Sequence, residues 1–199
     1  MTPFLIDTHD LGRRPGSMRT LQHEVTMPAR LGTDVIAIDE GTAVDLDLRL
    51  ESVMEGVLVS GTASTRAHGI CGRCLRPVSE ELTVDLNELF SYPERAAEFA
   101  RDAGEDDDPL PVLDGESLDL GPTLIDALVP ALPFQPLCRP DCPGLCPECG
   151  IPLDEAEPGH GHAAPIDPRW AALTALSEAT EASEDTAATR TADSPADPQ

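Results

Sequence analysis

Residues 22–92 show the two-residue period of hydrophobic positions that is typical of β-strands. Charged and apolar side chains alternate along residues 43–53, and the apolar ones share one face: Val44, Leu46, Leu48 and Leu50. This pattern predicts a half-buried antiparallel strand. Residues 55–68 and 76–92 predict two further strands of the same sheet, joined by a loop that contains a CGRC motif. A meander of antiparallel strands is the simplest topology.

Three short helices are expected outside the strands. The first is predicted within residues 93–104, with Pro93 in its first turn and Gly104 past its end. The second is predicted over residues 122–129 and ends before Pro130, and its apolar stripe comprises Leu124, Ile125, Leu128 and Val129. The third begins with Asp167 as its N-cap, and its apolar residues recur at helical spacing: Trp170, Leu173 and Leu176.

These elements predict the α+β class: a small antiparallel β-sheet with a few short helices and a zinc-knuckle or ribbon segment. One domain is expected over residues 20–177, with an acidic solvated loop at 101–120 and a cysteine cluster at 138–150. Residues 1–19 are predicted to form an irregular basic arm. Residues 178–199 are polar, acidic and rich in Ala, Thr and Ser, which predicts a disordered tail.

The charge of the chain changes which partners are expected. The 199 residues carry a formal net charge of −24, which opposes generic attraction to nucleic acid or to anionic membranes. No secretory signal is recognisable, and the longest apolar stretch is interrupted by an aspartate and two prolines. We therefore expect a cytoplasmic protein without a membrane partner. Thiols stay reduced in that compartment, so clustered cysteines bind metal or perform redox chemistry more often than they form disulfides.

The six cysteines form three close pairs, and a pair of histidines follows them in an HGH sequence. A tetrahedral zinc ion takes four such ligands, usually supplied as two close pairs from separate turns. The glycine after CPEC suits the tight turn of a zinc knuckle. The candidate ligands are therefore Cys71 and Cys74, Cys138 and Cys142, Cys146 and Cys149, and His160 and His162.

A structural zinc site is the favoured interpretation of these cysteines, and two others stay open. A redox dithiol would begin a helix after a buried parallel strand, and neither CxxC motif has that context. The cysteines could also be unligated thiols. The two histidines are equally well interpreted as solvated loop residues, because Gly159 and Gly161 make their segment flexible.

The pairing of the ligands has two solutions. In one, a single zinc ion is held by the four cysteines between residues 138 and 149, and the CGRC pair is left unused. In the other, CGRC meets CRPDC in one site and CPECG meets HGH in a second site. We favour two sites, because this explains the upstream CxxC and makes the metal a staple whose binding free energy contributes to folding.

The chain contains no sequence motif of an enzyme. It has no Walker loop, no GxGxxG, no serine nucleophile elbow and no HExxH. A site with four thiolates is closed, whereas a catalytic zinc keeps one position open. We therefore expect a protein without catalytic activity and without a small-molecule substrate.

Four sequence segments together resemble the YceD family, the bacterial proteins named for large ribosomal RNA subunit accumulation. The segments are IDTHDLGRRPGSMR, CGRCL with its following proline, PLCRPDCPGLCPECG and DPRWAAL, and the resemblance extends over residues 4–177. It implies a cytoplasmic role in the synthesis, processing or stability of 23S ribosomal RNA, and no enzymatic activity is established for the family. The six cysteines match the family's pattern.

The resemblance implies a precursor of large-subunit RNA, or a ribosomal protein, as the partner. If RNA is contacted directly, bidentate pairing with phosphate would fall to the arginines of the basic stretches: Arg13, Arg14, Arg19, Arg73 and Arg76. The favoured alternative is that they are solvated or paired with the abundant acids. The negative charge of the chain keeps an alternative open, in which a zinc-stabilised adaptor escorts a basic ribosomal protein without touching RNA.

Overall fold

A six-stranded antiparallel sheet is the largest element of the protein, which we describe from a computed structural model covering residues 4–102 and 110–162. The chain divides into two units, Met1–Glu155 and Ala156–Gln199, and the sheet and both described helices belong to the first. The strands of the sheet are β2 (Met18–Thr26), β3 (Leu31–Gly32), β4 (Ile36–Ile38), β5 (Ala43–Ser52), β6 (Gly56–Ile70) and β7 (Pro77–Ser91).

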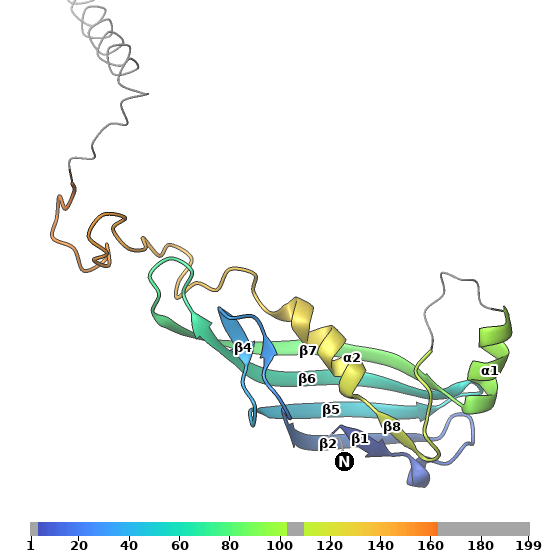
Figure 1. The fold of residues 1–199 in the computed structure, drawn as a ribbon. Coiled ribbons are helices and arrows are strands. Elements are labelled where there is room, and N and C mark those ends of the chain that lie inside the picture. The colour runs from blue at the N-terminus through green and yellow to red at the C-terminus, as the bar shows by residue number, and fades with distance from the viewer. Residues whose placement is uncertain (1–3, 103–109, 163–199) are drawn as a thin grey trace, which may run out of the picture. The chain divides into compact units, whose positions relative to one another are not determined.

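The sheet is a meander only in part. Strands β5, β6 and β7 follow one another as expected, but β2 lies beside β5, and the β3–β4 hairpin between them in the chain pairs with the far end of β6 (Figure 1). The reason is the length of β6, which has 15 residues while β5 has 10. Pairing with β5 ends at Thr65, so the last residues of β6 are left for β4.

The alternating pattern of residues 43–53 is confirmed. All four apolar side chains of β5 lie in the core, with at most 3% of their surface exposed, and the residues between them face solvent. The expected α+β class is also correct, since a mostly antiparallel sheet is combined with two helices. Helix α1 (Pro93–Asp102) occupies the first segment predicted as helical.

The second predicted helix is longer and more exposed than expected. Helix α2 spans Gly121–Ala131 and includes Pro130, which lies in its last turn, where only one further residue follows it in the helix. Leu124 and Leu128 are fully buried, but the predicted apolar stripe was too wide, because Ile125 and Val129 are 41% and 45% exposed. One narrow stripe is all that α2 buries against the core.

Two segments predicted to be irregular contribute to the core. Within the expected basic arm, β1 (Leu5–Asp7) pairs with β8 (Ser117–Asp119), which lies inside the expected acidic loop. A short 3-10 helix, η1 (His9–Leu11), follows β1. These predictions were wrong for residues 4–11 and 110–120 because isolated apolar side chains in both segments are buried: Phe4, Ile6, Leu11, Leu113, Leu118 and Leu120.

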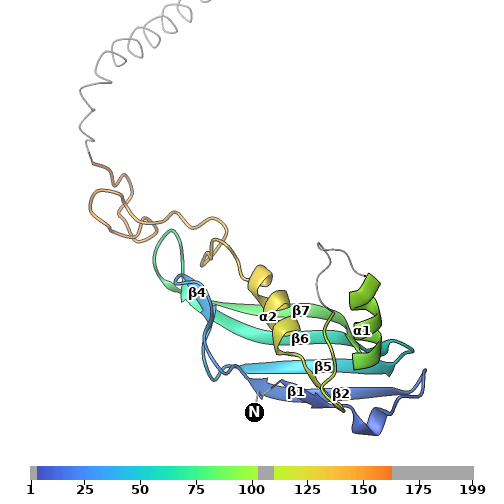
Figure 2. The ribbon, with the colours of Figure 1, turned by 45° about the vertical axis from the view of Figure 1, so that its right-hand side comes forward.

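The core lies on one face of the sheet. Helix α2 and the β1–β8 pair both lie on this face (Figure 2), and their buried side chains belong to the same hydrophobic cluster as those of β5, β6 and β7. In the part of the chain that the structure describes, no helix is long and apolar enough to cross a membrane. The helix predicted to begin at Asp167 and the tail at 178–199 lie outside the described residues, so both stay predictions.

Candidate metal centre

The loop between β6 and β7 forms a knuckle around Cys71 and Cys74. The backbone N–H of Cys71 donates to the carbonyl of Arg76 at 2.8 Å, and the N–H of Leu75 donates to the carbonyl of Cys71 at 3.0 Å. Leu75 closes this turn with φ 59°, and it is the one residue other than glycine with a positive φ among those described. The turn brings both thiols of CGRC to the same side of the loop.

The second pair of thiols comes from the segment that follows α2. The Sγ atoms of Cys71 and Cys142 lie 3.8 Å apart, and those of Cys74 and Cys138 lie 3.6 Å apart. All four sulfurs fall within 4.8 Å of one another. A tetrahedron of zinc–sulfur bonds of about 2.3 Å has edges of about 3.8 Å between sulfurs. The four thiols therefore fit the coordination shell of one tetrahedral ion.

Burial and backbone donors set the electrostatics of these sulfurs. Cys71, Cys74 and Cys142 are at most 5% exposed, while Cys138 faces solvent. The backbone N–H of Cys74 and further N–H groups lower the pKa of Cys71 to about 6, although burial opposes the shift. Hydrogen bonding with Cys142 and Cys74 raises the pKa of Cys138 to about 12. Thiolates this close repel one another, and a divalent cation would remove that repulsion.

Hydrogen bonds to backbone carbonyls join the two ligand pairs independently of the sulfurs. The N–H of Gly72 donates to the carbonyl of Pro136 at 2.8 Å, and Nη1 of Arg73 donates to the carbonyl of Cys142 at 2.9 Å. Three apolar side chains pack around the thiols: Val78, Leu137 and Leu145. The end of the β6–β7 hairpin and the segment after α2 thus form a small core of their own.

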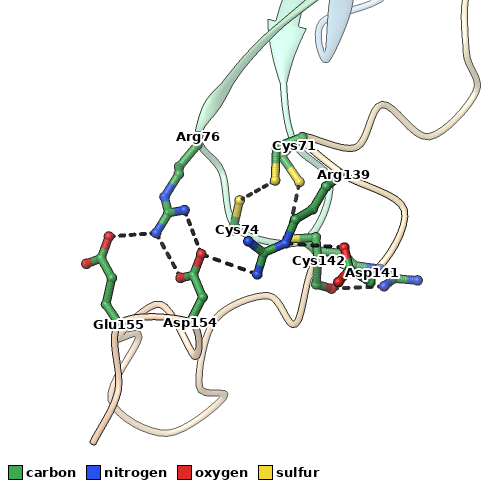
Figure 3. Close-up of polar contacts among 10 residues, drawn as sticks. Cys71, Cys74, Arg76, Arg139, Asp141, Cys142, Asp154 and Glu155 are labelled. Carbon is green, nitrogen blue, oxygen red and sulfur yellow. Dashed lines mark hydrogen bonds and ion pairs between the residues drawn. The ribbon is translucent and has the colours of Figure 1, made fainter.

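An arginine clamp adds a second layer to this centre. Arg76 donates through both Nη atoms to the carboxylate of Asp154 at 2.8 Å, and through Nη2 to Glu155 at 2.6 Å (Figure 3). Arg139 reaches Asp154 from the other side at 3.6 Å. The guanidinium of Arg76 lowers the pKa of Asp154 below its usual range. Sequence reasoning missed Arg139, Asp154 and Glu155, because no spacing rule connects residues so far apart in the chain.

The CPECG segment forms a second knuckle with the same backbone hydrogen bonds. The N–H of Cys146 donates to the carbonyl of Ile151 at 2.8 Å, and the N–H of Gly150 donates to the carbonyl of Cys146 at 2.9 Å. Gly150 has φ 72° and occupies the position that Leu75 has in the first knuckle. The two CxxC motifs of the chain therefore adopt one geometry, and the first of them is half of a four-sulfur cluster.

The two histidines belong to the short described part of the second unit. The ring centroids of His160 and His162 lie 4.8 Å apart with the rings at 86°, and the N–H of His160 donates to the carbonyl of Glu157. Two neighbouring imidazoles are donors that suit a zinc ion. Within the described part of the first unit, the group of side chains that can hold a metal ion consists of four cysteines: Cys71, Cys74, Cys138 and Cys142.

The arginines predicted as RNA contacts are scattered, and most have partners. Arg13 pairs with Glu94 at 2.8 Å and lies over the ring of Tyr92. Arg19 is 3.7 Å from Asp10, and Arg14 is exposed. Arg73 and Arg76 lie at the first knuckle, where they bind the Cys142 carbonyl and the carboxylates of the clamp. The structure does not gather the five into one basic surface.

Fold and site together define an α+β protein with cysteine groups that can hold a metal ion. The chain belongs to the family described as large ribosomal RNA subunit accumulation protein YceD, whose model matches residues 59–177, more than half of the chain and all six cysteines. The resemblance noted in the sequence is thus confirmed. The description of the family names an accumulation role for RNA of the large ribosomal subunit rather than an enzymatic activity.

Relatives of similar length occur in mycobacteria. Uncharacterized proteins of Mycobacterium tuberculosis and Mycobacterium bovis are each 51% identical to this chain over 175 residues, which cover 88% of the chain and 82% of the relative. An uncharacterized protein of Mycobacterium leprae is 46% identical over 174 residues, covering 87% and 77%. No solved structure matches the chain.

Proposed function

We propose that this protein is a non-catalytic, cytoplasmic factor in the biogenesis of the large ribosomal subunit, acting on the synthesis, processing or stability of 23S ribosomal RNA. The observation that carries the proposal is the four-cysteine cluster in a chain of the YceD family. Four sulfurs leave no open position for a substrate on a tetrahedral ion, so the metal has a structural role. The factor then works by binding an RNA precursor or a ribosomal protein.

The proposed cofactor is structural zinc, with two ions in each chain. Cys71, Cys74, Cys138 and Cys142 hold the first, and the S···S distances support this assignment. Cys146, Cys149, His160 and His162 hold the second. Support for the second ion comes from the CPECG knuckle, whose backbone hydrogen bonds repeat those of the first knuckle, and from the neighbouring imidazoles.

One observation favours a second candidate function, a zinc-stabilised protein–protein adaptor such as an escort for a basic ribosomal protein. Direct RNA contact needs cations that are free to pair with phosphate, and four of the five candidate arginines already pair with carboxylates or donate to a carbonyl. The net charge of −24 acts in the same direction, because it repels phosphate. RNA contact through Arg13, Arg14, Arg19, Arg73 and Arg76 remains the competing proposal.

Deletion of the gene tests the shared part of both candidates. The deletion strain should show a lower ratio of 23S to 16S RNA and fewer 50S than 30S particles, measured by RNA electrophoresis and sucrose gradients. Complementation should require the cysteines and should succeed with a chain that lacks residues 178–199. Normal subunit profiles, or complementation by a chain without cysteine, would count against the proposal. Charge reversal of Arg13, Arg14 and Arg19 distinguishes the two candidates. Loss of the protein's association with ribosomes would favour direct RNA contact, and unchanged association would favour the adaptor.

A further inference from the structure

The face of the sheet opposite the core is lined by short polar and acidic side chains. Two rows of directly paired residues cross it from β2 through β5 and β6 to β7, and all eight side chains are exposed or half-buried. The first row contains Gln22, Asp47, Thr62 and Asp85, and the second contains Glu24, Asp45, Ser64 and Thr83. We call the surface made by these eight residues the open face.

A shallow groove crosses the open face. It consists of three hollows of about 520, 490 and 310 Å³. The first two hollows share Asp45 and Ser64, and the second and third share Asp47 and Thr62, so the three are continuous. In the second and third hollows β6 contributes only small residues, which deepens the groove there: Ser60, Gly61, Thr62 and Ser64. Such a groove admits an extended chain rather than a compact ligand.

The groove carries a net negative charge, because its carboxylates outnumber its arginines. Arg49 and Arg66 are the arginines among the residues that line it, and each already pairs with a carboxylate of the same face, Glu51 and Glu81 respectively. Four carboxylates of the open face form no ion pair within the described residues: Glu24, Asp45, Asp47 and Asp85. They leave an uncompensated negative field over the groove.

We propose that the open face is the docking surface for an extended, arginine- or lysine-rich polypeptide segment. Guanidinium groups pair with carboxylates in a bidentate geometry, and the hydroxyls of Thr62, Ser64 and Thr83 accept further hydrogen bonds from such a segment. A phosphate backbone, by contrast, would be repelled by the same four carboxylates. The proposal rests on the adaptor form of the proposed function and names the surface that a basic partner would contact.

Binding of a labelled peptide to the full-length, zinc-loaded protein tests the proposal. The probe is a fluorescein-labelled peptide of about ten residues with alternating arginine and serine, which matches the length of β5 when extended. An RNA oligonucleotide with the same label is the second probe. The test variant combines Glu24→Gln, Asp45→Asn, Asp47→Asn and Asp85→Asn. The control variant removes the same charge from exposed positions elsewhere: Asp34→Asn, Glu40→Gln, Asp114→Asn and Asp126→Asn.

The test variant should bind the peptide roughly tenfold more weakly than the wild type in fluorescence anisotropy, while the control variant changes its affinity by less than about twofold. Equal weakening in both variants would mean general attraction by the charge of the chain and would overturn the proposal. Undiminished binding by the test variant, or preferential binding of the RNA probe, would overturn it as well. The peptide assay tests the docking surface and does not measure subunit assembly. A negative peptide result therefore does not contradict the ribosomal role, and a deletion strain with normal subunits does not contradict the docking surface.

Discussion

Loss of the first metal site should destabilise the sheet itself, whereas loss of the CPECG knuckle should not. The double substitution Cys71→Ser and Cys74→Ser removes half of the first cluster, whose sulfur pairs join residues 64 and 71 positions apart in the chain. The matched control, Cys146→Ser and Cys149→Ser, removes the same number of thiols from a segment that follows the sheet and both described helices. The two variants therefore differ in which part of the fold loses its cross-link.

The magnitude follows from the length of the closed loop. A cross-link that closes a loop of roughly 70 residues lowers the entropy of the unfolded chain by an amount equivalent to about 4 kcal/mol at 25 °C. With a urea dependence of about 2 kcal/mol per molar, this corresponds to a midpoint lower by about 2 M. Treatment of the wild type with a chelator should produce the same shift, because it breaks the cross-link without changing the sequence.

Two measurements check this prediction. Urea unfolding followed by far-ultraviolet circular dichroism reports the sheet, and elemental analysis counts the zinc, for which we expect two ions in the wild type and one in each double variant. If Cys71→Ser with Cys74→Ser removes one zinc but leaves the unfolding midpoint unchanged, the staple argument is refuted. The pairing of CPECG with the histidines would be refuted if the wild type bound one zinc ion and the variant with His160→Ala and His162→Ala bound the same number.

Two further predictions concern the packing of α2 and the arginine clamp. Leu124→Ala should lower the free energy of unfolding by about 3 kcal/mol, because Leu124 is fully buried. Ile125→Ala should lower it by less than about 1 kcal/mol, because Ile125 is 41% exposed. Urea unfolding measures both changes. The depressed pKa of Asp154 means that its pairing with Arg76 stabilises the fold above the unfolded pKa near 3.8 and is lost as the pH falls through the lower folded value. In the Arg76→Ala variant, the free energy of unfolding should therefore decrease less steeply below about pH 4 than in the wild type. The measurement is made on metal-stripped protein, so that protonation of the metal ligands does not contribute.

Local patterns in the sequence were enough to predict β5 and the first CxxC loop. The alternation in β5 reflects one buried face, and the two CxxC motifs form their own turns through hydrogen bonds within six residues. Long-range pairing was not predictable in the same way. Strand β8 has three residues within an acidic stretch, and its burial depends on β1, more than 100 residues earlier. Periodicity carries no information about such a short strand.

The candidate site shows the same division between local and long-range signals. Spacing identifies which cysteines act as pairs, because the sulfurs of a CxxC turn converge whatever the rest of the chain does. Spacing does not identify the partner of each pair. In the structure CGRC lies against CRPDC because the segment after α2 contacts the loop of the β6–β7 hairpin, where the N–H of Gly72 donates to the carbonyl of Pro136. The clamp of Arg76 on Asp154 depends on this meeting and joins residues 78 positions apart.

The position of the thiol cluster indicates what a bound metal ion would contribute to this fold. Strands β6 and β7 continue beyond the end of β5, so the tip of their hairpin lies at the opposite end of the sheet from α1, beyond most of the main core (Figure 1). The tip has a separate cluster instead, built on Cys71, Cys74 and Cys142 with three partly buried apolar neighbours. A cluster this small gains little from hydrophobic burial, whereas one tetrahedral ion supplies four bonds. A tetrahedral ion with four protein ligands would thus fix the shape of the hairpin tip without adding to the hydrophobic core.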